Sequence, residues 1–423
     1  MIFLYRVCTF LLYPLLLIVV YYRKIIQKED SIRFKEKIFS SCFNVVRKNS
    51  TKLIWFHAAS IGEFKSIVPI INKLISSHKN IEILITTTTL SSGILANNEI
   101  LKFQNVYHRF FPFDVSFLIN NFLNSWKPNY ILLVDSEIWP NLILSIKKRG
   151  IPLALINARL TSKSFNKWMK FPKTAKKIFN SFDLCLTSNV ETKHYLQKLS
   201  LQNVYCFGNI KLISEIDVNK IKNLNEKFLQ SRRFWVAAST HRGEDLFCLK
   251  THMKIKEVYK DLVTIIIPRH INKTNEILEL ANRLKLSTQL LNKNDIISKN
   301  KEVVIVNAFG ILPDYFNYAK SVFIGKSVIK KLKNDSGQNP IDAAKLGCKI
   351  YHGPYVYNFE EIYEILNKNN IATKIETYDE LSAYLIKDLE NPLKINSKSS
   401  EIIKNLGKQT LEDTMRHINN FIQ

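Results

Sequence analysis

The stretch Leu53-Ile-Trp-Phe-His-Ala-Ala-Ser-Ile-Gly-Glu-Phe-Lys65 joins a short apolar run to small residues and a carboxylate. An apolar run of this length, followed by helical periodicity, predicts a buried strand, a turn and the start of a helix. The small residues Ala58, Ala59 and Gly62 would let another molecule approach the backbone. Glu63 would lie in the first helical turn, where the helix macrodipole favours a negative charge.

Two interpretations of Glu63 follow from this pattern. Ser60 and Glu63 have the S-x-x-E spacing of a capping box, in which each side chain satisfies a backbone N–H at the helix start. Alternatively, the carboxylate acts on a substrate that approaches the turn. The two roles are compatible, because a capping carboxylate can also face a cleft.

Length and composition narrow the class of protein. A chain of 423 residues with 46% hydrophobic residues predicts two or three folded domains. The formal charge of +25 suggests an acidic partner, and it favours a membrane surface over nucleic acid, because no basic block is interleaved with aromatic residues. The six cysteines and nine histidines are scattered. This favours free thiols in a reducing compartment and argues against a structural zinc site.

Residues 1–25 predict a membrane anchor. The first 22 residues are nearly all apolar, which is enough to cross a bilayer, and no small-residue cleavage site follows. The basic residues from Arg23 to Lys37 place the rest of the chain in the cytoplasm by the positive-inside rule. Arg6 and Pro14 interrupt the apolar run, so a helix lying in the membrane interface is the alternative to a spanning helix.

From residue 52 onward, strand-like runs alternate with helical stretches, which predicts parallel sheets covered by helices. A polar segment at 209–233 interrupts this rhythm, so we expect two α/β domains facing a central cleft. The predicted domains are the anchor at 1–25, an N-terminal domain at 26–212, a C-terminal domain at 213–398, and a C-terminal helix at 399–423 that packs back on the N-terminal domain. The predicted strands are Leu53–Phe56, Ile81–Thr87, Val106–Phe110, Tyr130–Val134, Leu153–Asn157, Leu184–Thr187, Val204–Phe207, Phe234–Ala238, Val263–Pro268, Val303–Val306, Ser321–Ile324 and Lys349–Tyr351.

Several polar motifs follow the predicted strands, where open parallel sheets bind ligands. Five of them, in this order and over nearly the whole chain, resemble the 3-deoxy-D-manno-octulosonic acid (Kdo) transferases of lipopolysaccharide synthesis, which are membrane-anchored glycosyltransferases of the two-domain GT-B type. The matching motifs are His57-Ala-Ala-Ser-Ile-Gly-Glu63, Ser136-Glu-Ile-Trp-Pro-Asn141, Asn157-Ala-Arg-Leu160, Pro268-Arg-His270 and Gly337-Gln-Asn-Pro340.

The resemblance implies transfer of Kdo from CMP-Kdo to a tetra-acylated lipid A precursor, with inversion and with no metal or other cofactor. It implies that the protein acts on the cytoplasmic face of the inner membrane, without nucleic acid or an obligate protein partner. Glu63 would be the general base, and Ser60, Glu137 and Arg159 would lie on the acceptor side. The expected CMP-binding residues are Pro268, Arg269, His270, Phe309, Gly310, Gly337, Asn339 and Asp342.

The chain departs from the family pattern in the donor half. Gln338 stands where a His is usual, Asn307 where an Asp is usual, Ile311 where a Glu is usual, and Asp342 where a longer Glu would hold the ribose. These departures keep one alternative open, a membrane-tethered binding protein with an inactive glycosyltransferase fold. A transferase that uses another nucleotide sugar to modify a cell-envelope glycolipid is the second alternative.

Overall fold

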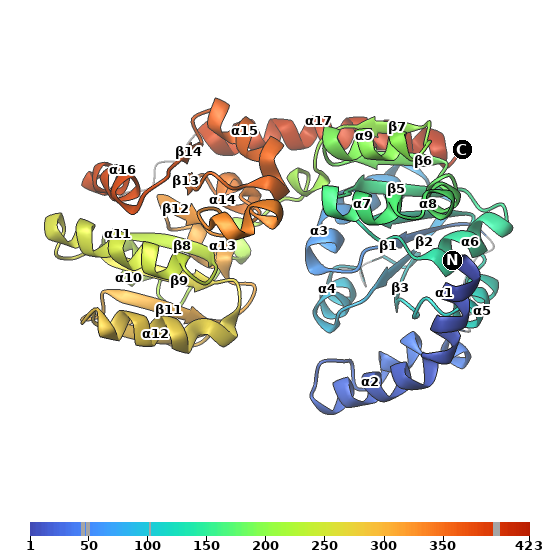
Figure 1. Ribbon diagram of the computed structural model, residues 1–423, viewed down its shortest axis with the longest axis horizontal. Helices are drawn as coiled ribbons and strands as arrows, with labels where there is room; N and C mark the ends of the chain where they lie inside the picture. Colours follow the sequence, from blue (N-terminus) through green and yellow to red (C-terminus); the bar gives the residue numbers. More distant parts are fainter. Residues whose placement is uncertain (44–46, 48–50, 101–102, 392–397) are drawn as a thin grey trace. The chain divides into compact units, whose positions relative to one another are not determined.

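The computed structural model describes residues 1–43, 47, 51–100, 103–391 and 398–423. It divides into two compact units, residues 1–214 together with 407–423, and residues 215–406. The boundary at Ser214 therefore lies two residues beyond the predicted one. Each unit is an α/β domain built on a seven-stranded sheet, and the elements can be followed in Figure 1.

The first unit has the strand order β3-β2-β1-β4-β5-β6-β7, and every pair is parallel. The order reverses between β1 and β4, which makes their carboxyl ends the topological switch point where such sheets bind ligands. The strands are β1 (Lys52–His57), β2 (Ile81–Thr87), β3 (Val106–Phe110), β4 (Tyr130–Val134), β5 (Leu153–Ala158), β6 (Leu184–Thr187) and β7 (Val204–Cys206).

Both faces of this sheet are covered by helices, which is why its strands are almost continuously apolar. In β1, Leu53 and Trp55 face one core, whereas Ile54 and Phe56 face the other. The helices of this unit are α1 (Ile2–Leu11), α2 (Tyr13–Ile25), α3 (Ile61–Ser77), α4 (Leu90–Ile100), α5 (Ser116–Trp126), α6 (Pro140–Lys148), α7 (Ser162–Met169), α8 (Pro172–Phe179), α9 (Val190–Lys198) and, from Gly407 onward, α17 (Lys398–Phe421), with short 3-10 helices η1 (Arg33–Lys37), η2 (Ser40–Cys42) and η3 (Ile210–Leu212).

The C-terminal part of α17 packs on the first unit. Met415 and Ile418 join the core that contains Ile54 of β1. Gly407 permits a close approach, because a Cβ there would lie 2.5 Å from the Leu212 backbone oxygen. The last helix thus contributes to the core of a unit whose other residues, 1–214, all lie far earlier in the chain.

The second unit has the order β10-β11-β9-β8-β12-β13-β14, again all parallel, with its switch point between β8 and β12. Its strands are β8 (Phe234–Thr240), β9 (Val263–Pro268), β10 (Thr288–Asn292), β11 (Val303–Asn307), β12 (Ser321–Ile324), β13 (Lys349–His352) and β14 (Ala372–Lys374). Its helices are η4 (Val218–Lys220), α10 (Glu226–Ser231), α11 (Glu244–Val258), η5 (Ile271–Lys273), α12 (Thr274–Arg283), α13 (Leu312–Phe316), η6 (Lys330–Asp335), α14 (Ile341–Lys345), η7 (Tyr357–Phe359), α15 (Glu360–Lys368) and α16 (Tyr378–Glu390).

The N-terminal segment differs from the single anchor helix that the sequence predicted. It forms two helices, α1 and α2, which are bent by 52° at Leu12. Pro14 explains the break, since proline has no backbone N–H to continue the helical hydrogen bonds. No single helix in the described part of the chain is long and apolar enough to span a membrane. Taken together, α1 and α2 are long and apolar enough, by length and composition alone.

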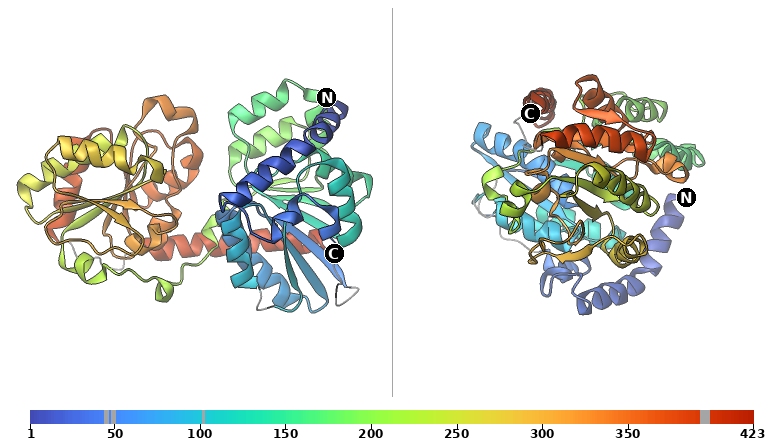
Figure 2. Two further views of the ribbon diagram at one scale, coloured as in Figure 1. Left: turned by 90° about the horizontal axis from the view of Figure 1, so that it is seen from below. Right: turned by 90° about the vertical axis from the view of Figure 1, so that its left-hand side faces the viewer.

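One side of the α1–α2 pair is fixed to the first unit. The Tyr5 hydroxyl donates to Asp114 Oδ2 at 2.9 Å, and the Tyr13 hydroxyl donates to the Ile38 carbonyl oxygen at 2.6 Å. Asp114 also accepts the first N–H groups of α6, and its burial raises its pKa to about 6. Figure 2 shows both helices, in dark blue, lying along the surface of the unit.

Candidate active site

Glu63 lies at the start of α3, directly beyond the carboxyl end of β1. Ser60 is the N-cap of this helix, and its hydroxyl accepts from the Glu63 N–H at 3.4 Å. The Glu63 carboxylate in turn accepts from the Ala59 N–H at 2.8 Å and from the Ser60 hydroxyl at 2.7 Å. The Ser60 half of a capping box is therefore present, whereas the carboxylate bonds to the N–H of Ala59, one residue before the N-cap; together these bonds hold the carboxylate in one orientation.

The electrostatic surroundings of Glu63 go beyond what a cap requires. Burial raises the pKa of Glu63, and the negative charges of Asp135 and Glu137 raise it further, although the Ser60 hydroxyl bond opposes them. Both neighbours follow β4, across the topological switch point from β1. A carboxylate with a raised pKa is a stronger proton acceptor once it is ionised. The structure thus brings together the predicted base and the predicted acceptor-side residue Glu137.

Glu137 ends a chain of hydrogen bonds that runs from its own partly buried carboxylate to the buried side chains of His57, Thr86 and Trp55. Its Oε2 atom accepts from Trp139 Nε1 at 2.6 Å and lies 3.2 Å from His57 Nε2. His57 Nδ1 lies 2.9 Å from the Thr86 hydroxyl, which itself accepts from Trp55 Nε1 at 2.9 Å. When His57 carries its proton on Nε2, every group in this chain has a partner.

These hydrogen bonds stabilise the ionised form of Glu137. Burial opposes its ionisation, but the bonds from His57 and Trp139 outweigh burial, so the pKa of Glu137 lies below its usual value. The sequence assigned no role to His57, although His57 begins the motif that ends at Glu63. Its full burial at the end of β1 is the feature that identifies it as a support.

Asp135 forms a second polar link that the sequence did not predict. It accepts from Lys211 Nζ at 2.9 Å and from the Asn157 side chain. Asn157 Oδ1 also accepts from the Ile210 N–H at 3.0 Å, which fixes the segment that carries Lys211. Lys211 therefore places a positive charge beside the carboxylate cluster. The sequence pattern indicated no role for Lys211, although it lies in the segment that follows β7 at the carboxyl edge of the sheet.

Arg159 and Ser136 line a pocket of about 410 Å³ within the first unit. The Ser136 hydroxyl donates to the Arg159 carbonyl oxygen at 2.7 Å, which joins the loop after β4 to the loop after β5. The predicted acceptor-side residues Glu137 and Arg159 thus lie in neighbouring loops at the carboxyl edge of one sheet. Ser60 belongs to the loop after β1 at the same edge.

In the second unit, the predicted donor residues lie in loops after three strands. Pro268 ends β9, and Arg269 and His270 follow it on the surface. The Arg269 N–H donates to the Thr240 carbonyl oxygen at 3.1 Å, and the His270 ring lies 5.6 Å from the ring of His241. The basic residues Arg269 and His270 therefore lie beside the end of β8, at the switch point of this sheet.

The Gly337 loop approaches the same edge. Gly337 has a φ of +85°, and its N–H donates to the Lys326 carbonyl oxygen at 2.7 Å. A Cβ at Gly337 would lie 3.0 Å from the Val356 backbone, so only glycine fits. Asn339 Oδ1 accepts from the Ile341 N–H at 3.0 Å at the entry to α14, which also carries Asp342.

Phe309 and Gly310 belong to a separate loop after β11. The Phe309 side chain is 66% exposed, and Gly310 has a φ of +75°. Asn307, which replaces the usual Asp, donates instead to Asn292 Oδ1 on the edge strand β10 at 3.0 Å. The side-chain amide of Asn307 is therefore hydrogen-bonded to the edge strand of its own sheet.

Glu244 supports the loops around the predicted CMP-binding residues, a role that the sequence pattern did not indicate. Its fully buried carboxylate accepts the backbone N–H groups of Lys326, Ser327 and Val328 at 2.6 to 3.1 Å, and that of His241 at 3.0 Å. It therefore holds the loop after β12 against the loop after β8. Among the described residues, no three His, Cys, Asp or Glu side chains are grouped to hold a metal ion.

Comparisons with known proteins agree with this architecture. Residues 33–214 match the family model described as 3-deoxy-D-manno-octulosonic-acid transferase (kdotransferase). The chain is 30% identical over 405 residues to a protein of Arabidopsis thaliana named probable mitochondrial 3-deoxy-D-manno-octulosonic acid transferase, covering 92% of this chain and 88% of that protein. It is 27% identical over 374 residues to the 3-deoxy-D-manno-octulosonic acid transferase of Haemophilus influenzae, covering 85% and 83%.

The crystal structure of a glycosyltransferase from Rickettsia africae has the same fold, with a TM-score of 0.57 at 12% identity over 89% of this chain and 100% of that one. The predicted fold of two parallel-sheet α/β domains of the GT-B kind is thereby confirmed. The relatives cover most of both chains, and one reaches 30% identity. The chain therefore belongs to the 3-deoxy-D-manno-octulosonic acid transferase family and is a glycosyltransferase.

Proposed function

We propose that this enzyme transfers Kdo from CMP-Kdo to a hydroxyl of the glucosamine disaccharide in a tetra-acylated lipid A precursor, with inversion and without a metal ion. The observation that carries the proposal is the Glu63 carboxylate, which is held at a strand-to-helix turn beside two further carboxylates. An alcohol becomes a good nucleophile only as it loses its proton, and an oriented carboxylate with a raised pKa is suited to accept that proton.

In the proposed step, the acceptor hydroxyl gives its proton to Glu63 and its oxygen attacks the anomeric carbon of Kdo. The bond from this carbon to the phosphate of CMP breaks, and the electron pair leaves with the phosphate. Arg269 and His270, which lie together at the carboxyl edge of the second sheet, would donate to the negative charge that develops there. CMP is a good leaving group, so one base suffices.

The direct test uses the full-length protein in detergent with CMP-Kdo and purified tetra-acylated lipid A precursor. We expect Kdo-modified acceptor by mass spectrometry, with an undiminished rate after a metal chelator is added. Bound CMP-Kdo without any product would instead support the inactive binding protein. Product formed only from a different nucleotide sugar would support the other transferase.

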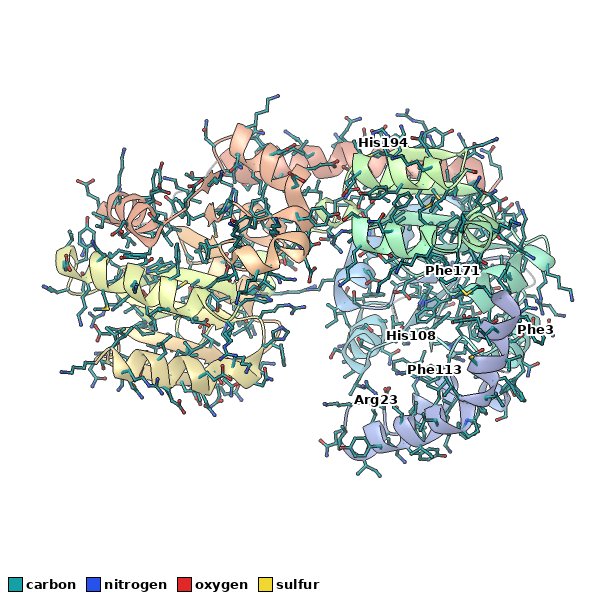
Figure 3. The ribbon with its side chains drawn as sticks, viewed as in Figure 1. Phe3, Arg23, His108, Phe113, Phe171 and His194 are labelled. Carbon is teal, nitrogen blue, oxygen red and sulfur yellow. The ribbon has the colours of Figure 1, made fainter. Side chains whose placement is uncertain are left out.

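We also propose that the α1–α2 pair attaches the enzyme to the cytoplasmic face of the inner membrane by lying in the interface. One side of the pair is bonded to the domain, and the other side exposes large apolar residues. Phe3, which is 79% exposed, marks the outer end of α1 in Figure 3. Lys24 at the end of α2 suits anionic headgroups, whereas its neighbour Arg23 is paired with Glu29 at 2.7 Å.

Replacing two outward apolar residues tests this attachment. Leu11→Lys combined with Ile18→Lys should weaken binding to anionic phospholipid vesicles about 100-fold or more, because each apolar side chain contributes roughly 1.5–3 kcal/mol when buried. The matched control is Ile94→Lys with Val190→Lys, which changes two exposed apolar residues on α4 and α9. Equal flotation of both double variants with vesicles would refute interfacial attachment by this pair.

A further inference from the structure

A short 3-10 helix lies between α2 and the edge of the first sheet. We call this helix, η1 (Arg33–Lys37), the connector. Its Phe34 packs with Val20 of α2 and with Ile38 in a small apolar core of their own, where each side chain is at most 1% exposed. The Tyr21 ring of α2 also meets the Phe34 ring edge to face, with centroids 5.2 Å apart. One side of the connector is therefore fixed to α2.

The other side of the connector is bonded to the carboxyl end of β3. The Arg33 guanidinium donates to the His108 carbonyl oxygen at 3.0 Å, and Glu36 Oε2 accepts from the Phe110 N–H at 2.7 Å. Figure 3 labels His108 on β3 and Arg23 in the last turn of α2. The connector thus joins α2 to the edge of the sheet where the candidate active site lies.

Lys37 of the connector forms a buried ion pair that reaches the loop after β2. Its ammonium group bonds to the Glu29 carboxylate and donates to the Thr88 carbonyl oxygen at 2.7 Å. The side chains of Lys37 and Glu29 are at most 5% exposed. The other oxygen of Glu29 accepts from Arg23 Nε at 2.7 Å. A chain of charged groups therefore runs from the end of α2 to Thr88.

Thr88 continues this chain to the candidate base. Its N–H donates to the Ala59 carbonyl oxygen at 3.2 Å, and the Ser92 hydroxyl of α4 donates to the same oxygen at 3.3 Å. The N–H of Ala59 in turn donates to the Glu63 carboxylate at 2.8 Å. A shift of the loop after β2 would therefore move the residue whose N–H orients that carboxylate.

The chemistry of the Glu29–Lys37 pair favours a role in geometry over a role in stability. Burial lowers the pKa of Lys37, although the bond and the charge of Glu29 oppose this effect, so the ammonium group depends on its partner to stay charged. A buried ion pair contributes little net stability compared with apolar side chains of similar volume, because both charges lose their water. Such a pair is suited instead to fix one arrangement of the groups that it joins.

We propose that Lys37 is a positioning residue for the candidate base, and that the connector transmits the seating of α2 to the turn that carries Glu63. The proposal rests on the proposed function, because it takes Glu63 as the group that accepts the proton of the acceptor. It goes beyond that function, because the geometry of the base then depends on a helix of the α1–α2 pair. An enzyme whose α2 is not seated against the connector would turn over slowly.

Lys37→Met tests the positioning role in the full-length protein in detergent. Methionine keeps the apolar stem of the side chain but removes the ammonium group, so the Thr88 carbonyl oxygen loses its donor, whereas Glu29 keeps Arg23. We expect kcat to fall about 10- to 100-fold, the effect of a small misplacement of a catalytic group, with an unchanged KM for CMP-Kdo. Lys37→Arg, which keeps the charge and the donors, should recover most of the loss.

Arg47→Met is the matched control, because it breaks an ion pair at the opposite end of the same strand. Arg47 Nε donates to Glu82 Oε2 at 2.7 Å near the amino end of β2, and the Glu82 side chain is 2% exposed. Both variants should lower the melting temperature, but only Lys37→Met should lower kcat when it is measured well below that temperature. Equal losses of kcat in the two variants, or no loss in Lys37→Met, would overturn the positioning role.

Val20→Ala tests the contribution of α2 with a smaller change. It removes methyl groups from the core that α2 shares with Phe34, so kcat should fall in the otherwise unchanged protein. In the Lys37→Met background, the same change should lower kcat by less than about twofold, because the two residues act through one route. Losses that multiply in the double variant, or an unchanged kcat in Val20→Ala alone, would refute the role of α2.

Amide hydrogen exchange separates this proposal from the proposed function, because it needs no turnover. In Lys37→Met, the peptides that contain Ala59 and Thr88 should exchange faster than in the wild type, whereas Arg47→Met should leave them unchanged. Faster exchange in a protein that transfers no Kdo would sink the proposed function and leave the coupling through the connector standing. Kdo transfer by the wild type, with unchanged exchange and unchanged kcat in Lys37→Met, would sink the connector alone.

Discussion

Glu63→Gln should reduce Kdo transfer about 100- to 10,000-fold, the usual contribution of a general base. The substitution keeps the geometry of the turn. The glutamine oxygen can accept from the Ala59 N–H, and its amide can donate to the Ser60 hydroxyl, which replaces the bond that Ser60 now donates to the carboxylate. We therefore expect an intact fold by thermal denaturation, unchanged binding of CMP-Kdo, and a kcat that is almost abolished.

Two cap variants distinguish a base from a purely structural carboxylate. Ser60→Ala removes the N-cap of α3 but leaves the Glu63 carboxylate in place, and Asn189→Ala removes the N-cap of α9 elsewhere in the unit. Each should cost about 1 kcal/mol of stability. If Glu63 only caps the helix, Ser60→Ala should lower kcat as much as Glu63→Gln does. If Glu63 is the base, the loss in Glu63→Gln should be at least tenfold larger.

Glu137→Ala should lower the free energy of unfolding by about 2–5 kcal/mol and abolish most activity, because two donors, the fully buried His57 and the partly buried Trp139, lose their acceptor. Both His57 Nε2 and Trp139 Nε1 bond to the same carboxylate atom, Oε2. Glu137→Gln should therefore keep the fold, since one amide oxygen can occupy that position. Chemical denaturation of both variants measures the difference, and equal destabilisation would show that the two donors do not depend on Oε2.

Glu137→Gln, which is neutral at this position, also reports on the pKa of Glu63. The negative charge of Glu137 is one of the causes that raise the pKa of Glu63, after burial and Asp135. Its removal in Glu137→Gln should lower that pKa, so the acidic limb of the pH–rate profile should move to lower pH. An unchanged limb would mean that the titrating group is not Glu63.

Most of the fold could be predicted from the sequence because its central strands are buried on both faces. The runs in β1, β4 and β9 are almost continuously apolar, and the structure places them where the pattern did. Two strands were missed, β10 and β14, which lie at the two edges of the second sheet. Edge strands bury less of their surface, and β14 is only three residues long, so neither has a strong pattern.

The candidate site was predictable only in part, because its supports are contacts between distant residues. The turn from Ser60 to Glu63 is local, and the bonds between these two residues have the spacing that the sequence predicted. Lys211 meets Asp135 across 76 positions, and Glu244 meets the loop at Lys326 across 82. Single-sequence spacing carries no information on such pairs, although each residue follows a strand of a parallel sheet. The placement of Glu63 at a cleft between the two domains remains a prediction.

The central claim is that the Glu63 carboxylate accepts the acceptor's proton. It is tested most directly by the single-turnover rate of Kdo transfer by the wild type across the acidic and neutral pH range, with CMP-Kdo saturating. A base must be ionised, and the pKa of Glu63 is raised above the usual value. The account therefore predicts that the rate falls with decreasing pH, with the slope of a single proton, through a pKa above that of an ordinary glutamate. A rate that stays constant through that range would contradict it.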